Sequence, residues 1–213
     1  MPEKLFKTAS IYIVVEFLNK SVPFILLPIL TRYLTPSEYG LLSLFTVYIY
    51  ILVILCSLGL SSSISVNYHQ LHKSSISIYN STSFIIIFIT WVILLLITIA
   101  FKKVLVEFTG IPFFWIVMAY PIVLTIIYFL NYMNLLQMKM KPIRFSFFQL
   151  TKSFLEGGLS VFFVVILLRS WVGRLEAMLI ISIIFFFVII YFMVKDKLLP
   201  KRMYFSKKYA KDG

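Results

Sequence analysis

Six long apolar stretches follow one another along the chain, separated by short polar segments. Each is long enough, as a helix rising about 1.5 Å per residue, to cross a hydrocarbon core of about 30 Å. The stretches cover residues 8–34, 36–62, 78–100, 112–137, 145–168 and 172–194. The pattern therefore predicts an all-α, polytopic membrane protein with six transmembrane helices in residues 1–194, followed by a basic cytoplasmic tail or linker at residues 195–213.

The first apolar stretch carries two opposite charges. Glu16 and Lys20 lie four residues apart and so share a face of the predicted helix, together with Asn19 and Pro23. A charge near the bilayer centre costs several kcal/mol unless it is paired or hydrated, so we expect this face to meet a bundle interior or an aqueous cavity. Pro23 and Pro28 each remove an intrahelical hydrogen bond, which predicts a bent helix.

The second apolar stretch opens with a helix-start signal. Thr35, Pro36 and Glu38 fit a capping box with proline at the first helical position. Farther along, a stripe of polar side chains that includes Tyr50 and Ser61 follows one face of this helix. Such a stripe either lines a cavity or packs helices together through small hydroxyl residues.

The fifth apolar stretch carries a second charged face. Gln149, Lys152 and Glu156 fall within an arc of roughly 100° on a helix. Gly157 and Gly158 follow directly, and they allow a bend or the close approach of a neighbouring helix.

The first and fifth helices run in the same direction across the membrane, so the depths of their charges can be compared. At about 1.5 Å per residue, Glu16 lies level with Lys152 and Lys20 lies level with Glu156. If the two helices are neighbours, two ion pairs between them form a nearly neutral quartet. That quartet is either a clamp that holds the bundle together or part of a polar cavity whose ammonium groups are offered to an anionic ligand.

Composition agrees with a membrane protein. Hydrophobic residues make up 61% of the chain and the mean hydropathy is +0.99, more apolar surface than a soluble domain can hide. The net charge of +12 is explained by topology: with both termini inside, most lysines and arginines are cytoplasmic, while Arg169 and Arg174 are counted among the outer segments. We therefore expect a multi-pass protein of the inner membrane with cytoplasmic termini, and no nucleic-acid partner.

Candidate chemistry is sparse. The single cysteine, Cys56, lies inside an apolar stretch and excludes a disulfide framework. His69 and His72 are three residues apart but have no third ligand nearby, so they are interpreted as solvated loop residues. The sequence predicts no metal site, no cofactor and no catalytic residues.

Residues 23–45, PFILLPILTRYLTPSEYGLLSLF, resemble the opening of bacterial polysaccharide biosynthesis membrane proteins, the O-antigen and teichoic-acid exporter family of Wzx-like flippases. This family shares a superfamily with the multidrug and toxic-compound extrusion transporters. The positions that stand as in the family pattern are Pro28, Arg32, Tyr33, Leu34, Glu38, Tyr39 and Gly40.

The resemblance implies about 12 or 14 spans arranged as two lobes of six around a central cavity, of which this chain has the N-terminal lobe. It also implies a substrate, an oligosaccharide on undecaprenyl pyrophosphate, moved between leaflets by alternating access. The implied partners are membrane lipid, a second lobe or a homodimer partner, and polysaccharide polymerase machinery. Arg32 would attract the pyrophosphate, anchor the helix at the interface or pair with Glu38, and Glu16 and Glu156 would be candidates for coupling to protons or sodium.

Two other functions are weighed against this one. A cation-coupled exporter of small molecules is suggested by the buried carboxylates. A membrane-embedded glycosyl or acyl transferase of envelope synthesis is disfavoured, because the short loops hold no acidic metal-binding pair and no pairing of histidine with aspartate. The site residues predicted to line a cavity or bind substrate are Glu16, Asn19, Lys20, Arg32, Tyr50, Gln149, Lys152 and Glu156.

Overall fold

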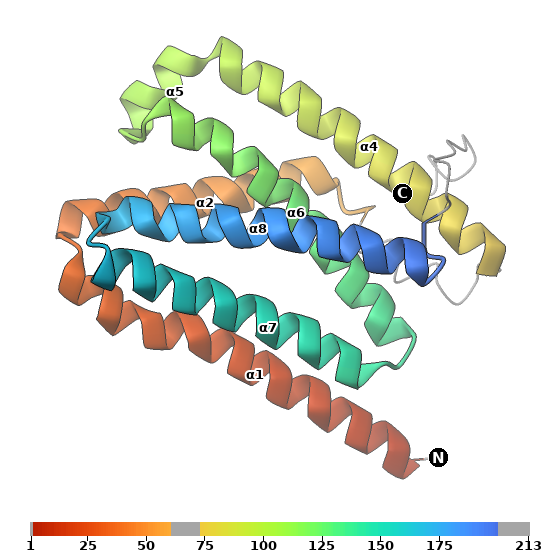
Figure 1. Ribbon diagram of the computed structural model, residues 1–213. Helices are drawn as coiled ribbons and strands as arrows, with labels where there is room; N and C mark the ends of the chain where they lie inside the picture. Colours follow the sequence, from red (N-terminus) through yellow and green to blue (C-terminus); the bar gives the residue numbers. More distant parts are fainter. Residues whose placement is uncertain (1, 61–72, 200–213) are drawn as a thin grey trace. The chain divides into compact units, whose positions relative to one another are not determined.

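The computed structural model describes residues 2–60 and 73–199 of the 213-residue chain. These residues form helices joined by short turns, and no strand occurs among them (Figure 1). The helices are α1 (Pro2–Tyr33), α2 (Pro36–Ser57), α4 (Lys73–Ala100), α5 (Lys102–Thr109), α6 (Phe113–Met138), α7 (Pro142–Val161), the π-helical turn η1 (Phe162–Ile166) and α8 (Ser170–Lys195). Within the described ranges, six helical segments are long and apolar enough to cross a membrane, which confirms the predicted all-α membrane fold.

The second helix is shorter than predicted. α2 ends at Ser57 and not near residue 62, because Leu58 and Gly59 take left-handed backbone angles with φ of 47° and 75°. At its start the predicted capping box is confirmed: the Thr35 backbone N–H donates to Glu38 Oε2 at 2.8 Å, and the Glu38 N–H donates to Thr35 Oγ1 at 3.4 Å. Ser61 lies outside the described residues.

A short helix, α5, occupies a segment that the sequence pattern assigns to a loop. It ends at Gly110, whose φ of 68° reverses the chain and whose N–H donates to the Val106 carbonyl at 2.9 Å. Next to it, the Lys102 ammonium lies 4.8 Å from the ring centre of Phe113, at the first residue of α6. Eight residues are too few for hydrophobic periodicity to reveal such a helix.

The turn between α7 and α8 also differs from the prediction. α7 widens into η1, and Leu168 and Ser170 then take positive φ angles of 50° and 54°. α8 begins at Ser170, two residues earlier than expected. Arg174 belongs to the first turns of this membrane-spanning helix, whereas the charge count placed it among the outer segments.

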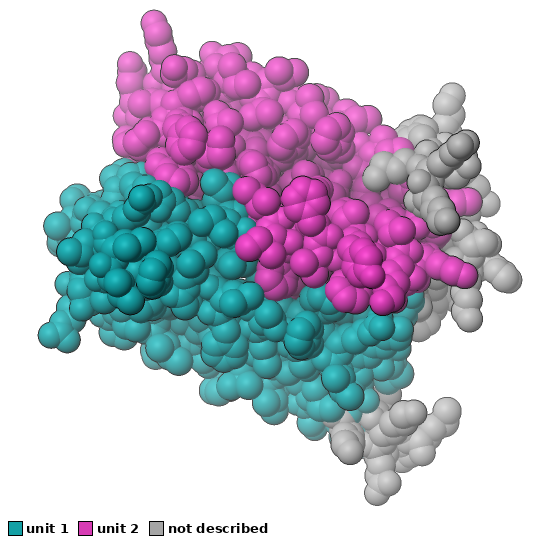
Figure 2. Space-filling view, viewed as in Figure 1, with its two compact units in different colours: residues 1–44, 136–181 teal, residues 45–135, 182–213 magenta. Residues whose placement is uncertain are grey.

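The described helices fall into two compact units, Met1–Leu44 with Leu136–Ile181 and Phe45–Leu135 with Ser182–Gly213 (Figure 2). In the first unit, α1 and α7 lie side by side along their length (Figure 1). Gly157 makes this approach possible, because a Cβ there would lie 3.0 Å from Val22 Cγ1. Tyr12 and Phe145 add an edge-to-face contact with ring centres 5.0 Å apart. The neighbour relation assumed for the first and fifth spans is thus correct.

The second unit packs α4, α6 and α8 through aromatic side chains. The Tyr128 ring lies 4.4 Å from that of Phe84 and 5.6 Å from that of Phe186, measured between centres. Tyr120 joins α6 to α4, since its hydroxyl donates to the Leu94 carbonyl at 2.8 Å and lies 2.5 Å from Thr98 Oγ1. Ring packing and satisfied hydroxyls therefore hold these helices together.

The first residues of the predicted tail pack against the second unit. Leu198 and Leu199 are buried, and the Asn80 side-chain amide donates to the Leu198 carbonyl at 3.0 Å. The first residues of the predicted tail therefore pack against the helices, and its cytoplasmic location stays a prediction. Residues 200–213 lie outside the described part of the chain.

Candidate functional site: a charged cluster on α7 and α8

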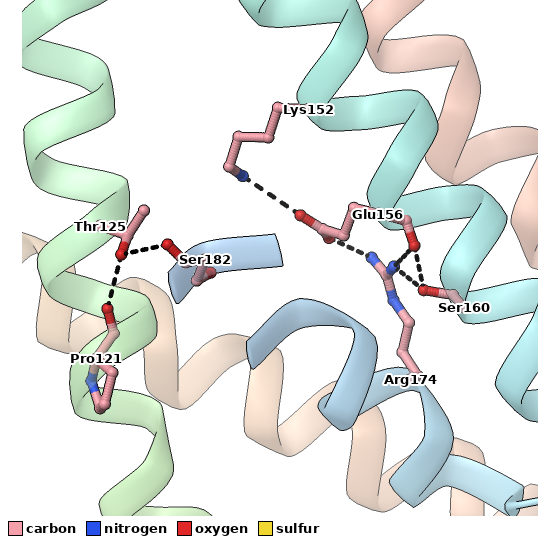
Figure 3. A network of polar contacts seen from close by, with 7 residues as sticks. All are labelled: Pro121, Thr125, Lys152, Glu156, Ser160, Arg174 and Ser182. Carbon is pink, nitrogen blue, oxygen red and sulfur yellow. Dashed lines mark hydrogen bonds and ion pairs between the residues drawn. The ribbon is translucent and has the colours of Figure 1, made fainter. Parts of the chain in front are cut away.

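Four polar side chains of the first unit form one network within the membrane-spanning helices α7 and α8 (Figure 3). Lys152 Nζ lies 3.3 Å from Glu156 Oε2, and Arg174 Nη2 lies 2.9 Å from Glu156 Oε1. Arg174 Nη1 donates to Ser160 Oγ at 2.5 Å, and Ser160 Oγ donates to the Glu156 backbone carbonyl at 2.5 Å. We call Lys152, Glu156, Ser160 and Arg174 the Glu156 cluster.

Local geometry explains why these residues meet. Lys152, Glu156 and Ser160 are spaced by four residues, so they lie above one another on a single face of α7. Arg174 reaches them from α8 because the turn after η1 folds α8 back along α7. The cluster therefore ties two consecutive spans together.

The cluster is secluded and contains charges of both signs. The three ionic side chains keep only 15–17% of their surface exposed. Lys152 and Arg174 supply two formal positive charges and Glu156 one negative charge. Charged groups at such positions in membrane spans are costly unless paired, and Glu156 supplies the pairing here.

This donor set has a definite chemical capacity. A guanidinium and an ammonium that converge on one carboxylate also match the oxygens of a phosphate or another carboxylate. An anion that reaches the cluster would therefore compete with Glu156 for Arg174 and Lys152. The site can exchange an internal counter-ion for an external one.

The charged pair on α1 lies apart from this cluster. Tyr12, Ile13, Glu16, Phe17 and Lys20 line an open groove of about 410 Å³ on that helix. The Glu16 side chain is half-buried and that of Lys20 is exposed. The Tyr12 hydroxyl is buried and has no hydrogen-bond partner within the described part of the chain. Both charged residues of α1 thus line an open groove.

The predicted ion pairs between α1 and α7 are not formed. Among the residues that the structure describes, no ion pair joins Glu16 to Lys152 or Lys20 to Glu156, although their helices are neighbours. Glu156 is engaged instead by Lys152 on its own helix and by Arg174 from α8. A partner four residues away on the same helix is always within reach, whereas a partner on another helix must also match in rotation and height.

The remaining predicted residues are scattered. Asn19 on α1 and Gln149 on α7 are half-buried, whereas Arg32 at the end of α1 is exposed. Tyr50 belongs to the second unit and is 61% exposed. No hydrogen bond or ion pair joins any two of these four side chains in the described ranges.

Glu38 does not pair with Arg32. Its carboxylate accepts hydrogen bonds from the Thr35 hydroxyl at 2.8 Å and from the Ser170 hydroxyl. It therefore links the start of α2 to the start of α8.

Sequence reasoning missed Arg174. The signal was present, since a helix that starts at Ser170 places Arg174 within its first turns, on a membrane-spanning segment. No group of three histidine, cysteine, aspartate or glutamate side chains that could hold a metal occurs among the described residues. His69 and His72 lie outside them.

Comparisons with known proteins agree on a membrane-protein family. A family model described as "Polysaccharide biosynthesis protein" matches residues 5–212. The "Lsg locus putative protein 1" of Haemophilus influenzae is 36% identical over 81 residues, which is 38% of this chain and 20% of that protein.

Two solved structures share the fold. One is described as the outward-facing conformation of a multidrug resistance MATE family transporter of the MOP superfamily, with a TM-score of 0.73 and 18% identity over 97% of this chain and 50% of that one. The other, MATE in complex with Br-NRF, has a TM-score of 0.67 and 16% identity over 96% and 48%. The chain spans about half the length of these structures.

Proposed function

Since the chain belongs to the polysaccharide biosynthesis protein family, we propose that it forms part of a transporter that moves an oligosaccharide on undecaprenyl pyrophosphate across the membrane. Such a substrate has a sugar head, an anionic pyrophosphate and a long isoprenoid tail. Transport of this kind requires no covalent step, so the protein acts as a carrier and not as an enzyme. Six membrane-spanning helices and a fold shared with solved transporters support this proposal.

The Glu156 cluster is the observation that carries the proposal. It brings a guanidinium and an ammonium to one carboxylate on two membrane-spanning helices. A pyrophosphate would accept hydrogen bonds from Arg174 and Lys152 in place of that carboxylate. Glu156 would take those bonds back after release, so the site would not remain a trap for anions.

The groove on α1 is consistent with a larger polar cavity. The charged side chains of Glu16 and Lys20 line this groove, although they belong to a membrane-spanning helix. In this proposal they face the passage used by the sugar head, together with Asn19 and Gln149 of the same unit. Tyr50, on the second unit, is proposed separately as a residue that contacts the substrate. Arg32, which is exposed at the end of α1, would meet the anionic substrate at the outer membrane surface.

A second lobe completes the proposed transporter. The chain matches about half of each solved structure. The other six helices would come either from a continuation of the same chain or from a second copy. We place the protein in the inner membrane with both termini cytoplasmic, and the transported unit would pass to polysaccharide polymerase machinery on the outer side.

A second candidate function is a cation-coupled exporter of small molecules. One observation favours it: the Glu16 carboxylate lies in an open groove and forms no ion pair with any described residue. Such a carboxylate can accept a proton, a sodium ion or a cationic drug. The same preparation of protein can test both candidates.

The test uses the full chain in vesicles of phosphatidylethanolamine and phosphatidylglycerol, with a fluorescent undecaprenyl-pyrophosphate sugar. We expect the protein to bind this lipid and to raise the fraction that a membrane-impermeant quencher reaches. Arg174→Gln should weaken binding by about tenfold, the equivalent of one lost charged contact of about 1.4 kcal/mol. Arg169→Gln is the matched control, because Arg169 pairs with Glu176 outside the cluster and is 55% exposed.

Two results would contradict the proposal. One is the absence of any binding of the labelled lipid while a lipophilic cation is bound or moved, which would favour the exporter. The other is equal weakening by both arginine variants, which would remove the Glu156 cluster from substrate binding.

A further inference from the structure

The second unit holds an apolar pocket that the proposed head-group site does not use. It has a volume of about 260 Å³ and is formed by α4, α6 and α8. Its walls are Trp91, Pro121, Leu124, Thr125, Ile183, Phe186 and Phe187. We call it the Trp91 pocket.

The two hydrogen-bonding side chains in its wall are already engaged. The Trp91 indole N–H donates to the Tyr120 carbonyl at 2.9 Å. Thr125 Oγ1 lies 3.0 Å from the Pro121 carbonyl and 3.1 Å from the Ser182 carbonyl, so its hydrogen is shared between two acceptors (Figure 3). The pocket therefore offers hydrocarbon and ring surface and no free donor, which excludes a polar ligand.

The pocket lies near the middle of three spans. Trp91, Thr125 and Ile183 are each about 20 Å along their helices from the first residue of the span, at about 1.5 Å per residue. This is close to the midplane of a hydrocarbon core about 30 Å thick. The chemical class that reaches such a pocket is a hydrocarbon chain.

One residue of the wall, Trp91, is fixed in place by its neighbours. Trp91 is held by its hydrogen bond and by rings on two sides, since it stacks on Phe88 with centres 5.7 Å apart and meets the Tyr120 ring edge-on at 5.8 Å. A side chain that is already ordered loses little conformational entropy when a ligand binds. The pocket can therefore retain one kind of chain longer than the exchanging lipids around it.

We propose that the Trp91 pocket binds a segment of the isoprenoid tail of the transported lipid; the identity of that lipid rests on the proposed function. Inside a bilayer every tail is equally apolar, so selection depends on packing contacts. An isoprenoid chain carries a methyl branch on every repeat and makes more contacts in such a hollow than a straight acyl chain of equal length. The pocket would thus hold a segment of the tail.

The experiment uses the full chain in nanodiscs of phosphatidylethanolamine and phosphatidylglycerol, with a diazirine-bearing undecaprenol that has no head group. Ile183→Trp fills the pocket, and Ile184→Trp is the matched control, since Ile184 is the next residue, is similarly exposed (49% against 45%) and does not line the pocket. We expect photolabelling of α4, α6 or α8 beside the pocket, reduced about tenfold by Ile183→Trp alone. In the unmodified chain, unlabelled undecaprenol should compete and added phosphatidylglycerol should not.

Equal labelling of the two variants would overturn the inference, and so would equal competition by phosphatidylglycerol, which would make the occupant an ordinary membrane lipid. The outcome is separable from that of the proposed function. Binding of the fluorescent pyrophosphate lipid with no labelling of the pocket leaves the transporter proposal standing and removes the tail site. Labelling of the pocket with no binding of that lipid leaves the undecaprenol site standing and removes the transporter proposal.

Discussion

Arg174→Ala removes the guanidinium that closes the Glu156 cluster. Arg174 donates to Glu156 Oε1 at 2.9 Å and to Ser160 Oγ at 2.5 Å, with 15% of its side chain exposed. Breaking a fully buried ion pair costs about 3–5 kcal/mol, whereas an exposed pair contributes about 0–1 kcal/mol. The cluster lies between these limits and Lys152 stays beside the carboxylate. We therefore expect the free energy of unfolding to fall by about 2 kcal/mol.

The assay is unfolding by sodium dodecyl sulfate in mixed micelles, followed by tryptophan fluorescence. Arg169→Ala is the control, because the Arg169–Glu176 pair has the same chemistry but its arginine is 55% exposed, and its loss should cost less than about 1 kcal/mol. A double-mutant cycle of Arg174→Ala with Glu156→Ala should give a coupling energy of about 1 kcal/mol or more. Equal losses for the two arginine variants, or a coupling energy near zero, would refute the reasoning.

Three further substitutions test the packing of the two units in the same titration. The Gly157→Ala variant should be less stable than Gly158→Ala by about 1–2 kcal/mol. A Cβ at residue 157 would lie 3.0 Å from Val22, while one at residue 158 has no such neighbour within 4 Å. Equal stabilities would contradict close packing of α1 on α7. Glu38→Ala should cost about 1 kcal/mol by removing the capping carboxylate of α2, and an unchanged midpoint would show that the cap is dispensable. Tyr120→Phe should cost about 1–2 kcal/mol, since the hydroxyl of this buried residue donates to the Leu94 carbonyl at 2.8 Å; no loss would mean that the bond is replaced.

The parts of the fold that depend on neighbouring residues were predictable from sequence. Runs of apolar residues identified the six spans, and the Thr35 and Glu38 pattern located the start of α2 correctly. The glycine at residue 157 indicated that a neighbouring helix could come close, and α1 does so there. Each of these signals acts over a few residues of the chain.

The pairing of the charges was not predictable, because it depends on how helices turn toward one another. Counting residues from the start of each span placed Lys20 level with Glu156. This count does not give the direction in which each side chain points around its helix axis. Arg174 falls within the predicted span 172–194 but was counted with the outer charges, so the partner that Glu156 selects was overlooked. The Trp91 pocket was hidden for the same reason, since its walls come from three helices.

The two-to-one charge ratio around Glu156 has a consequence for how the chain enters the membrane. While α7 is being inserted, Lys152 and Glu156 already neutralise each other one turn apart, so this span can leave the insertion machinery without an unpaired charge at that point. The second cation, Arg174, follows 18 residues after Glu156 in the chain, when the carboxylate that it contacts is already in place. Replacing Glu156 by a neutral residue would therefore make membrane insertion less favourable at two steps. Lys152 would lack this carboxylate while α7 is inserted, and Arg174 would lack it when α8 follows.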